Sequence, residues 1–264
     1  EMKKIAIIGT GRMGSWLSTK LIKDCEVAVF DIDPEKTAGL EGVTCLGQLE
    51  ELKDFSPDLL LNAVSLARTV EAFQAAMRFI PKNCLLADIA SVKAELGIYY
   101  VSCGRRFVSS HPMFGPTFAD LSQLQEENAI LIRESDAEGK SFFRQFYGQL
   151  GLKVFEYSFE EHDQIIAYSL AVPFASTLVF AAQLNVLAVP GTTFRKHLQI
   201  ARGLLSEDDA LLAEILFNPY ALPQLGKITQ RLEFLKHIIK QRDDDEMRRF
   251  LNRLRENVQS GNRR

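Results

Sequence analysis

The sequence predicts an α/β protein in two parts: a doubly wound, mostly parallel β-sheet, then an all-α part. Short apolar segments rich in branched residues alternate with amphipathic segments up to about residue 158, and no convincing strand follows. The composition agrees, because 47% hydrophobic and 25% charged residues in a chain of 264 are ordinary for a globular protein. We therefore expect a sheet domain over residues 1–158 and a helical domain over residues 159–264.

Seven segments are predicted strands because each is short, apolar and bounded by turn residues. They cover residues 5–8, 26–30, 59–64, 84–88, 107–110, 128–132 and 152–155. Helices are expected between them over residues 12–23, 70–79 and 138–150. Strands that alternate with helices imply parallel pairing, with helices on both faces of the sheet.

We interpret the second part of the sequence as helical throughout. Residues 160–187 predict one long apolar helix, bent near Pro173, and shorter helices follow around residues 194–216. A helix apolar over most of its circumference should be buried on several sides, and we expect part of that burial to come from a second subunit in a homodimer. Residues 228–239 and 247–258 place apolar side chains at helical spacing, and the acidic run 243–246 suits the start of the last helix.

Charge and cysteine content exclude several classes of protein. The net charge of −3 gives no case for nucleic-acid binding. The four cysteines form no metal-ligand pattern, so no metal is expected, and such scattered thiols are typical of a cytoplasmic protein. We expect no apolar run to reach the roughly 20 residues that a membrane span needs, so no membrane partner is expected.

A glycine-rich turn, G-T-G-R-M-G at residues 9–14, follows the first strand and opens the first helix. In such a turn Gly9 permits the sharp bend, Gly11 lets the backbone approach a pyrophosphate, and Gly14 lets the helix pack close to the sheet. The helix N-terminus then offers free amide groups to the phosphates. This context predicts a Rossmann-type dinucleotide site. The residues assigned to the cofactor here are Gly9, Gly11, Arg12, Met13 and Gly14.

Asp31 closes the second predicted strand, where a carboxylate accepts hydrogen bonds from the adenosine ribose. Its charge repels a 2′-phosphate, and no basic residue follows it until Lys36, so NAD is favoured over NADP. Asp33 is a nearby rival for the same role.

Two polar segments follow later strands and should reach the same edge as the glycine turn. One contains Ser91 and the other His111, which precedes a proline- and glycine-rich loop. A histidine held there suits a general base, since it titrates near neutral pH. The alternatives are structural: His111 bonding backbone at a strand end, and Ser91 capping a helix. Three other histidines, in helical stretches, are interpreted mainly as surface or interface residues: His162, His197 and His237.

The motifs G-T-G-R-M-G, D-I-A-S-V-K (88–93), H-P-M-F-G-P (111–116) and E-H-D-Q-I-I-A-Y (161–168) resemble the prephenate dehydrogenase family. The resemblance is closest to the branch often fused to chorismate mutase and runs from about Lys3 to Ile215 in the same order. Any such fused chorismate-pathway domain would lie outside this chain.

The resemblance implies a reaction and the residues that perform it. The reaction is NAD-dependent oxidative decarboxylation of prephenate to 4-hydroxyphenylpyruvate, in tyrosine biosynthesis. By resemblance, His111 is the catalytic histidine, Ser91 orients histidine, substrate and nicotinamide, and Ser65 lies beside the nicotinamide half. The glycines of the turn and Asp31 carry over as cofactor residues.

A substrate with two carboxylates needs at least one fixed cation, and arginine grips a carboxylate in a planar, bidentate way. The resemblance singles out Arg195, with Lys196 and Arg202 as rivals on the same predicted helix. The alternative for Arg195 is that it merely caps or solvates its helix. Another branch of the family carries a histidine-rich S-H-L-P-H segment, and residues 168–174 here lack those histidines, so their contacts do not carry over.

Two other functions stay open at this point. An arogenate dehydrogenase has the same ring chemistry on a substrate with an amino group in place of the keto group. A regulatory protein that senses NAD would keep the dinucleotide fold without catalysis.

Overall fold

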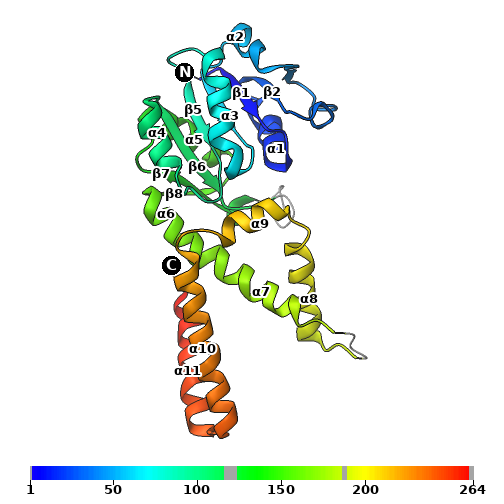
Figure 1. Cartoon of the computed structure of the whole chain (residues 1–264), viewed down its shortest axis with the longest axis vertical. Helices are drawn as coiled ribbons and strands as arrows, with labels where there is room; N and C mark the ends of the chain where they lie inside the picture. The colour runs from blue at the N-terminus through cyan, green and yellow to red at the C-terminus, as the bar shows by residue number, and fades with distance from the viewer. Residues whose placement is uncertain (1, 116–123, 186–188, 262–264) are drawn as a thin grey trace. The chain divides into compact units, whose positions relative to one another are not determined.

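A computed structural model describes residues 2–115, 124–185 and 189–261 (Figure 1). It forms two compact units, Glu1–Ala221 and Leu222–Arg264, which are described separately. Within the first unit the last strand ends at Tyr157 and a helix begins at Phe159. The change from sheet to helix thus falls where the sequence predicts it, and the domain limit expected at residue 158 stays a prediction.

The sheet has eight strands in the order β3-β2-β1-β4-β5-β6-β7-β8. All neighbours pair in parallel except β6 and β7, which confirms a mostly parallel, doubly wound sheet. The strands are β1 (Lys4–Ile8), β2 (Glu26–Phe30), β3 (Thr44–Cys45), β4 (Leu59–Asn62), β5 (Leu85–Asp88), β6 (Phe107–Pro112), β7 (Asn128–Ile132) and β8 (Lys153–Tyr157). Only β3 lies outside the predicted strands, because its two exposed residues carry no apolar signal.

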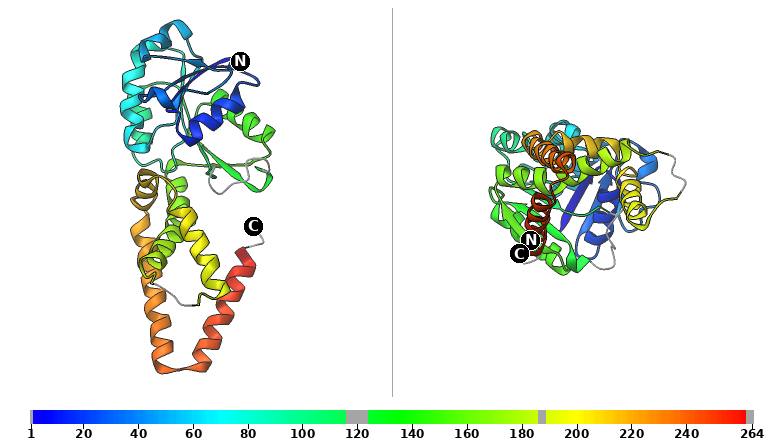
Figure 2. Two further views of the ribbon diagram at one scale, coloured as in Figure 1. Left: turned by 90° about the vertical axis from the view of Figure 1, so that its right-hand side faces the viewer. Right: turned by 90° about the horizontal axis from the view of Figure 1, so that it is seen from below.

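Helices cover both faces of the sheet (Figures 1 and 2). Alternate residues of each strand point to opposite faces, so Ile5 and Ile7 pack with α1 and α5, while Ala6 and Ile8 pack with α2, α3 and α4. These helices are α1 (Arg12–Leu21), α2 (Leu52–Phe55), α3 (Leu66–Ala76), α4 (Leu96–Cys103) and α5 (Ala137–Gln149). Short 3₁₀ turns are η1 (Pro34–Lys36), η2 (Leu49–Glu51), η3 (Met77–Phe79) and η4 (Leu124–Glu126).

The order of the strands reverses at β1, which has β2 on one side and β4 on the other. In open α/β sheets this switch point leaves a crevice beyond the carboxyl ends of the strands, where ligands bind. Gly9 follows β1 directly, and a Cβ on Gly9 would lie 2.8 Å from Val64 Cγ1, just past β4. The glycine turn therefore lies in the crevice.

After the sheet come α6 (Phe159–Ile166), η5 (Ala167–Ala171), α7 (Val172–Ala182), α8 (Thr192–Leu204) and α9 (Asp209–Leu216). The long apolar helix predicted over residues 160–187 is one run with a π turn just before Pro173, a residue that has no amide hydrogen for the helix. The predicted end of that helix at residues 186–187 lies outside the described residues.

Of two expectations for this helix, its burial on several sides stays a prediction and the absence of a membrane-length apolar run is wrong. None of the residues of α7 is buried within the chain, and Val179 is 62% exposed, so burial of α7 would have to come from a second subunit. The run Phe159–Ala182 is also long and apolar enough to cross a membrane by length and composition, contrary to the expectation that no such segment exists. Its first turns, however, bind the sheet domain, because Asp163 accepts hydrogen bonds from the backbone of Lys93 and Ala94.

The second unit is a pair of helices, α10 (Ala221–Gln241) and α11 (Asp244–Gly261). Phe234 and Phe250 pack edge to face with ring centroids 5.6 Å apart. The acidic residues predicted at the helix start do occupy the first turn of α11. Other apolar side chains at the predicted helical spacing stay exposed in the chain, among them Leu232, Ile239 and Val258.

Candidate active site

The three glycines of the turn do three different things. Gly9 has a φ of +91°, a region that favours glycine. A Cβ on Gly14 would lie 1.9 Å from the carbonyl oxygen of Gly9, so only glycine lets α1 approach the turn. A Cβ on Gly11 would meet nothing within 4 Å, and Gly11 is the N-cap of α1 without a side-chain cap. The space beside Gly11, with the free amide groups of the helix, fits a phosphate.

Asp31 holds the glycine turn from the end of β2. Its Oδ2 accepts hydrogen bonds from Thr10 N (2.8 Å) and Thr10 Oγ1 (3.2 Å), and its Oδ1 accepts from Asp33 N (3.0 Å). Partial burial acts to raise the Asp31 pKa, but these hydrogen bonds and Lys36 outweigh it and lower the pKa. The carboxylate is therefore ionised and preorganised at the crevice. Its rival Asp33 instead caps η1 by accepting from Glu35 N.

A pocket of ≈ 150 Å³ adjoins Asp31 and has the size and apolar lining that suit a flat ring. Gly9, Ile32 and Arg68 also line it. Arg68 comes from α3, and the structure shows no ion pair or side-chain hydrogen bond for it among the described residues. No local pattern of residues singled out Arg68, because the fold alone brings α3 beside the end of β2. A cation thus faces this pocket, although none directly follows Asp31 in the sequence.

Arg12 links the glycine turn to the helices. Its guanidinium donates to Glu207 Oε2 (3.2 Å) and to the carbonyl oxygen of Ser206 (3.3 Å), in the segment between α8 and α9. Met13 is half-buried against the core beneath the turn. Ser65 is the half-buried N-cap of α3 and follows the residues that touch Gly9. Their predicted roles at the cofactor stay predictions.

Ser91 follows β5, and His111 lies near the carboxyl end of the neighbouring strand β6, in which Ser109 pairs with Asp88 of β5. They therefore lie at the same edge as the glycine turn, as predicted. His111 lies within β6 rather than after it, because the strand continues to pair with β7, and its side chain is only 3% exposed. Ser91 is half-buried, and among the described residues its side chain has no hydrogen bond. Pro116, the last residue of the His111 motif, lies outside the described residues.

His162 is the main residue that the sequence analysis placed wrongly. It was expected at the surface or an interface, but it is fully buried in α6. Its Nε2 lies 3.0 Å from His111 Nδ1, and its Nδ1 lies 2.8 Å from Asp163 Oδ1. The Asp163 carboxylate also accepts hydrogen bonds from the amides of Lys93 (2.8 Å) and Ala94 (2.7 Å). The signal available was the E-H-D motif itself, which joins α6 to the sheet edge.

Burial governs the ionisation of both histidines. It lowers the pKa of His111 well below its ordinary value, and the nearby His162 and Lys93 lower it further. Burial likewise lowers the pKa of His162, although Asp163 acts in the opposite direction. His111 is therefore neutral at pH 7 and able to accept a proton.

A buried ion pair supports the histidine from below. Lys93 Nζ donates to Asp88 Oδ1 (2.7 Å) and to the carbonyl oxygen of Ser110 (2.7 Å), and both charged side chains are inaccessible to solvent. Tyr100 Oη donates to the other carboxylate oxygen of Asp88 (2.7 Å). This cluster joins the ends of β5 and β6, so it holds the backbone next to His111 in place.

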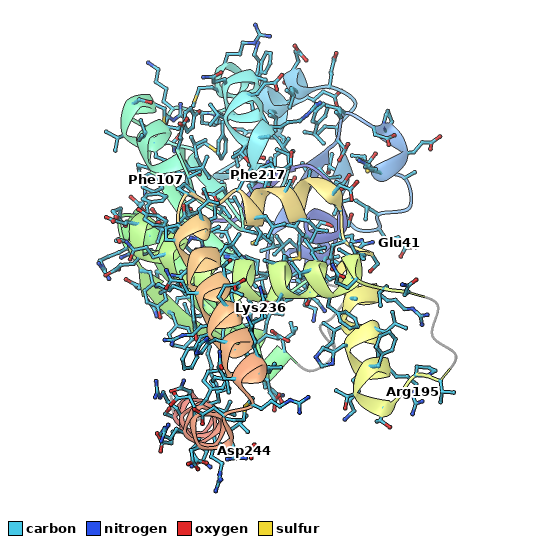
Figure 3. All side chains as sticks on the ribbon, turned by 60° about the horizontal axis from the view of Figure 1, so that its bottom comes forward. Glu41, Phe107, Arg195, Phe217, Lys236 and Asp244 are labelled. Atoms are coloured by element: carbon cyan, nitrogen blue, oxygen red, sulfur yellow. The ribbon has the colours of Figure 1, made fainter. Side chains whose placement is uncertain are left out.

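The predicted substrate cations on α8 are less well placed. Arg195 donates to the carbonyl oxygen of Pro190 (2.8 Å) and to Thr192 Oγ1 (3.2 Å), which is the helix-end role considered as its alternative (Figure 3). Lys196 and Arg202 are exposed and make no side-chain hydrogen bond or ion pair with the described residues. Arg202 is about one turn before Ser206, the contact of Arg12, whereas Arg195 is about 16 Å away along the helix axis. None of the three contacts His111 among the described residues.

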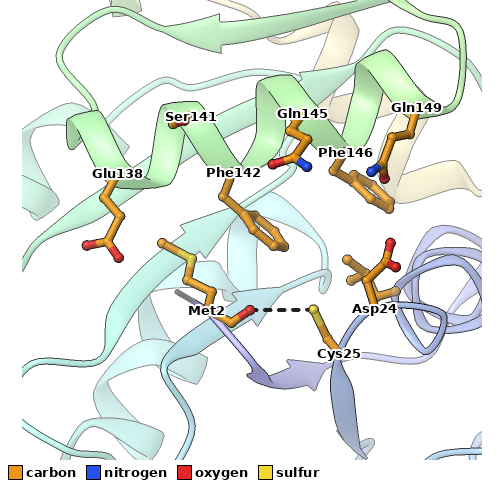
Figure 4. Close-up of a pocket in the computed structure, with 10 residues that line it drawn as sticks. Met2, Asp24, Cys25, Glu138, Ser141, Phe142, Gln145, Phe146 and Gln149 are labelled. Carbon is orange, nitrogen blue, oxygen red and sulfur yellow. Dashed lines mark hydrogen bonds between the residues drawn. The ribbon is translucent and has the colours of Figure 1, made fainter.

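A second cavity, of ≈ 430 Å³, lies between α5 and the residues around the amino ends of β1 and β2 (Figure 4). It is lined by none of the predicted site residues. Cys25 lines it, but burial raises the pKa of this thiol, and its Sγ donates to the carbonyl oxygen of Met2. Two other histidines, His197 and His237, are exposed within the chain, as predicted. Within the described ranges there is no group of three or more His, Cys, Asp or Glu that could hold a metal ion.

Comparison with known proteins gives consistent matches. Residues 19–143 match the family described as "Prephenate dehydrogenase, nucleotide-binding domain". The chain is 24% identical to the T-protein of Haemophilus influenzae over 229 residues, which are 83% of this chain and 57% of that protein. It is 26% identical to the chloroplastic arogenate dehydrogenase 2 of Arabidopsis thaliana, over 88% of this chain and 69% of that one. The chain thus spans little more than half the length of the T-protein.

Solved structures share the fold over almost the whole chain. Prephenate dehydrogenase from Aquifex aeolicus, in complex with hydroxyphenyl propionate and NAD+, superposes with a TM-score of 0.85 at 18% identity and covers 98% of both chains. Synechocystis arogenate dehydrogenase gives a TM-score of 0.75 at 17% identity, over 97% of this chain and 99% of that one. Together with the match of residues 19–143 to the nucleotide-binding domain of the prephenate dehydrogenase family, these findings confirm the resemblance of the motifs to that family.

Proposed function

We propose that this protein is an NAD-dependent dehydrogenase that oxidises and decarboxylates prephenate to 4-hydroxyphenylpyruvate. The observation that carries the proposal is His111, which is neutral, buried and hydrogen-bonded at the same sheet edge as the glycine turn. The Aquifex relative, whose structure contains NAD+ and hydroxyphenyl propionate, supports the choice of cofactor and of an aromatic product.

The residues of the crevice fit NAD. The open space at Gly11 suits the pyrophosphate, and the ionised Asp31 suits two free ribose hydroxyls better than a 2′-phosphate. When bound, the nicotinamide supplies the acceptor for a hydride. Arg68 lines the pocket beside Asp31, where its guanidinium would give that half of the cofactor a second contact by stacking.

The reaction requires two things of the protein: to align the substrate for hydride transfer and to accept the hydroxyl proton. As the hydride leaves the hydroxyl-bearing ring carbon, His111 accepts the hydroxyl proton and a C=O bond forms. The bond to the ring carboxylate then breaks, carbon dioxide leaves, and its electron pair makes the ring aromatic. The ring oxygen takes the proton back, so the histidine returns to its neutral state. Ser91, half-buried beside this path, orients the hydroxyl.

A steady-state comparison with prephenate and arogenate, each with NAD and NADP, tests the proposal. We expect turnover of prephenate with NAD. His111→Asn should bind NAD normally and lose about 10²-fold or more of the turnover, because the proton acceptor is gone. Turnover of neither substrate with either cofactor, or near-wild-type turnover by His111→Asn, would overturn it.

Two alternatives are decided by the same experiment. An arogenate dehydrogenase would turn over arogenate in preference, and relatives from Arabidopsis and Synechocystis bear that name. A regulatory protein that senses NAD would bind NAD without turning over either substrate. The proton-accepting arrangement at His111 favours an enzyme over this second alternative.

We also propose that the protein is a homodimer through its helical part. The support is the apolar helix α7, which has no buried residue within the chain and exposes Val179. Light scattering of the wild type should give the mass of a dimer, and Val179→Asp should give the monomer. A monomeric wild type that gains mass only with detergent or vesicles would favour a membrane instead.

A further inference from the structure

A chain of three buried side chains leads from α6 to the histidine at the sheet edge. Asp163 Oδ1 lies 2.8 Å from His162 Nδ1, and His162 Nε2 lies 3.0 Å from His111 Nδ1. All three residues are buried, with at most 4% of the residue exposed. Among the described residues, His111 Nε2 has no hydrogen-bond partner, so this ring nitrogen is the end of the hydrogen-bonded series of side chains.

The donors and acceptors available to these three side chains determine which ring nitrogens carry a hydrogen. The carboxylate of Asp163 already accepts two backbone amide hydrogens, from Lys93 and Ala94, which an ionised carboxylate does best. It is therefore the acceptor for His162, and His162 Nδ1 carries a hydrogen. A neutral His162 then has only a lone pair on Nε2. His111 Nδ1 must supply the hydrogen of the bond between the two rings.

The opposite arrangement requires a second positive charge in the cluster. For His162 Nε2 to donate to His111, either His162 must be an imidazolium or Asp163 must be protonated. Lys93, fully buried and paired with Asp88, already places a positive charge near both rings. An added imidazolium there is unfavourable, because like charges in a poorly solvated site repel strongly.

We propose that His162 and Asp163 are positioning residues that hold His111 in the tautomer with the hydrogen on Nδ1, so that Nε2 is the proton acceptor in the reaction. This rests on the proposed function for its catalytic consequence only. The hydroxyl proton of the substrate moves to the Nε2 lone pair as the hydride leaves, and it returns to the ring oxygen after decarboxylation. With the other tautomer, Nε2 carries a hydrogen and cannot accept this proton.

Nitrogen NMR of protein labelled at histidine tests the tautomer directly, because the shift of a ring nitrogen differs with and without its hydrogen. In the wild type we expect the Nδ1 of His111 to be protonated and its Nε2 unprotonated at pH 7.5, with His111→Asn used to assign the signal. His162→Leu removes the acceptor, so the signal should shift toward the other tautomer. His162→Gln keeps an oxygen acceptor and should retain the wild-type tautomer.

Kinetics test the consequence. His162→Leu should lower kcat by about tenfold, less than His111→Asn, since most histidines then present the wrong nitrogen, while NAD affinity and the melting temperature change little. His162→Gln should recover most of that loss. His197→Leu, the same change at an exposed histidine on α8, should be silent.

Several results would overturn the inference: a wild-type His111 with its hydrogen on Nε2, an unchanged tautomer in His162→Leu, or full kcat in that variant. If the wild type turns over neither prephenate nor arogenate, the proposed function fails, but the tautomer measurement still decides the positioning role. If His162→Leu does not fold, the wild-type spectrum and His162→Gln remain as tests.

Discussion

The sheet edge and helix α8 carry the two halves of the candidate site, and they are built in opposite ways. At the edge, the polar side chains are buried and hydrogen-bonded: Lys93 donates to Asp88, and His162 is hydrogen-bonded to Asp163 and His111. On α8, Arg195, Lys196 and Arg202 are exposed, and among the described residues Arg195 is hydrogen-bonded only to the start of its own helix. The residues at the sheet edge are therefore preorganised by folding, whereas no such contact between described residues fixes the three cations of α8.

The largest effect should come from the buried ion pair at the edge. Lys93→Met leaves the Asp88 carboxylate buried without its cation, which should cost about 3–5 kcal/mol of the free energy of unfolding. Urea denaturation measures it. The exposed pair of Arg106 and Asp136 is the control, and Arg106→Met should cost about 1 kcal/mol or less. Equal losses of unfolding free energy in the two variants would mean that the buried ion pair stabilises the fold no more than the exposed one does.

The pH dependence of stability tests the two buried histidines. Their pKa values are lowered in the folded state, while in the unfolded chain they lie near the ordinary value of about 6.5. Below that pH the two histidines bind protons in the unfolded state but stay neutral in the folded state. Stability is therefore full above about pH 6.5 and falls as the pH drops, by up to about 1.4 kcal/mol per pH unit for each histidine. Denaturation at pH 7.5, 6.5 and 5.5 measures this. His162→Gln should roughly halve the slope, and a flat profile would contradict burial of neutral histidines.

Two glycines of the turn separate folding from cofactor binding. Gly14→Ala places a Cβ against the Gly9 carbonyl oxygen. The free energy of unfolding should therefore fall by about 1–3 kcal/mol, and the melting temperature should fall with it. Gly11→Ala meets no protein atom, and its φ of −63° suits alanine, so stability should hold. Its Cβ would fill the space for the pyrophosphate, and NAD affinity, measured by calorimetry, should drop more than tenfold. Unchanged affinity in Gly11→Ala would place the pyrophosphate elsewhere.

Much of this edge was predictable from the sequence because its signals are local. The glycine turn, Asp31 and the strand before His111 each form within a few residues of their motif, and the structure places all of them at one edge. Arg68 and His162 reach the site only through the fold, from α3 and α6, so no local pattern assigned them a role. The burial of α7 stays a prediction for a related reason: an apolar surface indicates that something covers it, but not whether the same chain does.

The substrate cation is the point at which motif and geometry disagree, so it gives the sharpest test of the comparison. Resemblance favours Arg195, but within one chain Arg202 lies nearer the contact between Arg12 and Ser206. If the site is completed within one chain, Arg202→Ala should raise the KM for prephenate roughly tenfold, as expected for a lost charged hydrogen bond, and Arg195→Ala should not. The reverse result would mean that α8 moves on binding or serves the site of a second subunit. Mixing Arg195→Ala with inactive His111→Asn, assayed at prephenate concentrations well below the KM, distinguishes these two cases, because activity above that of Arg195→Ala alone requires a site shared between chains.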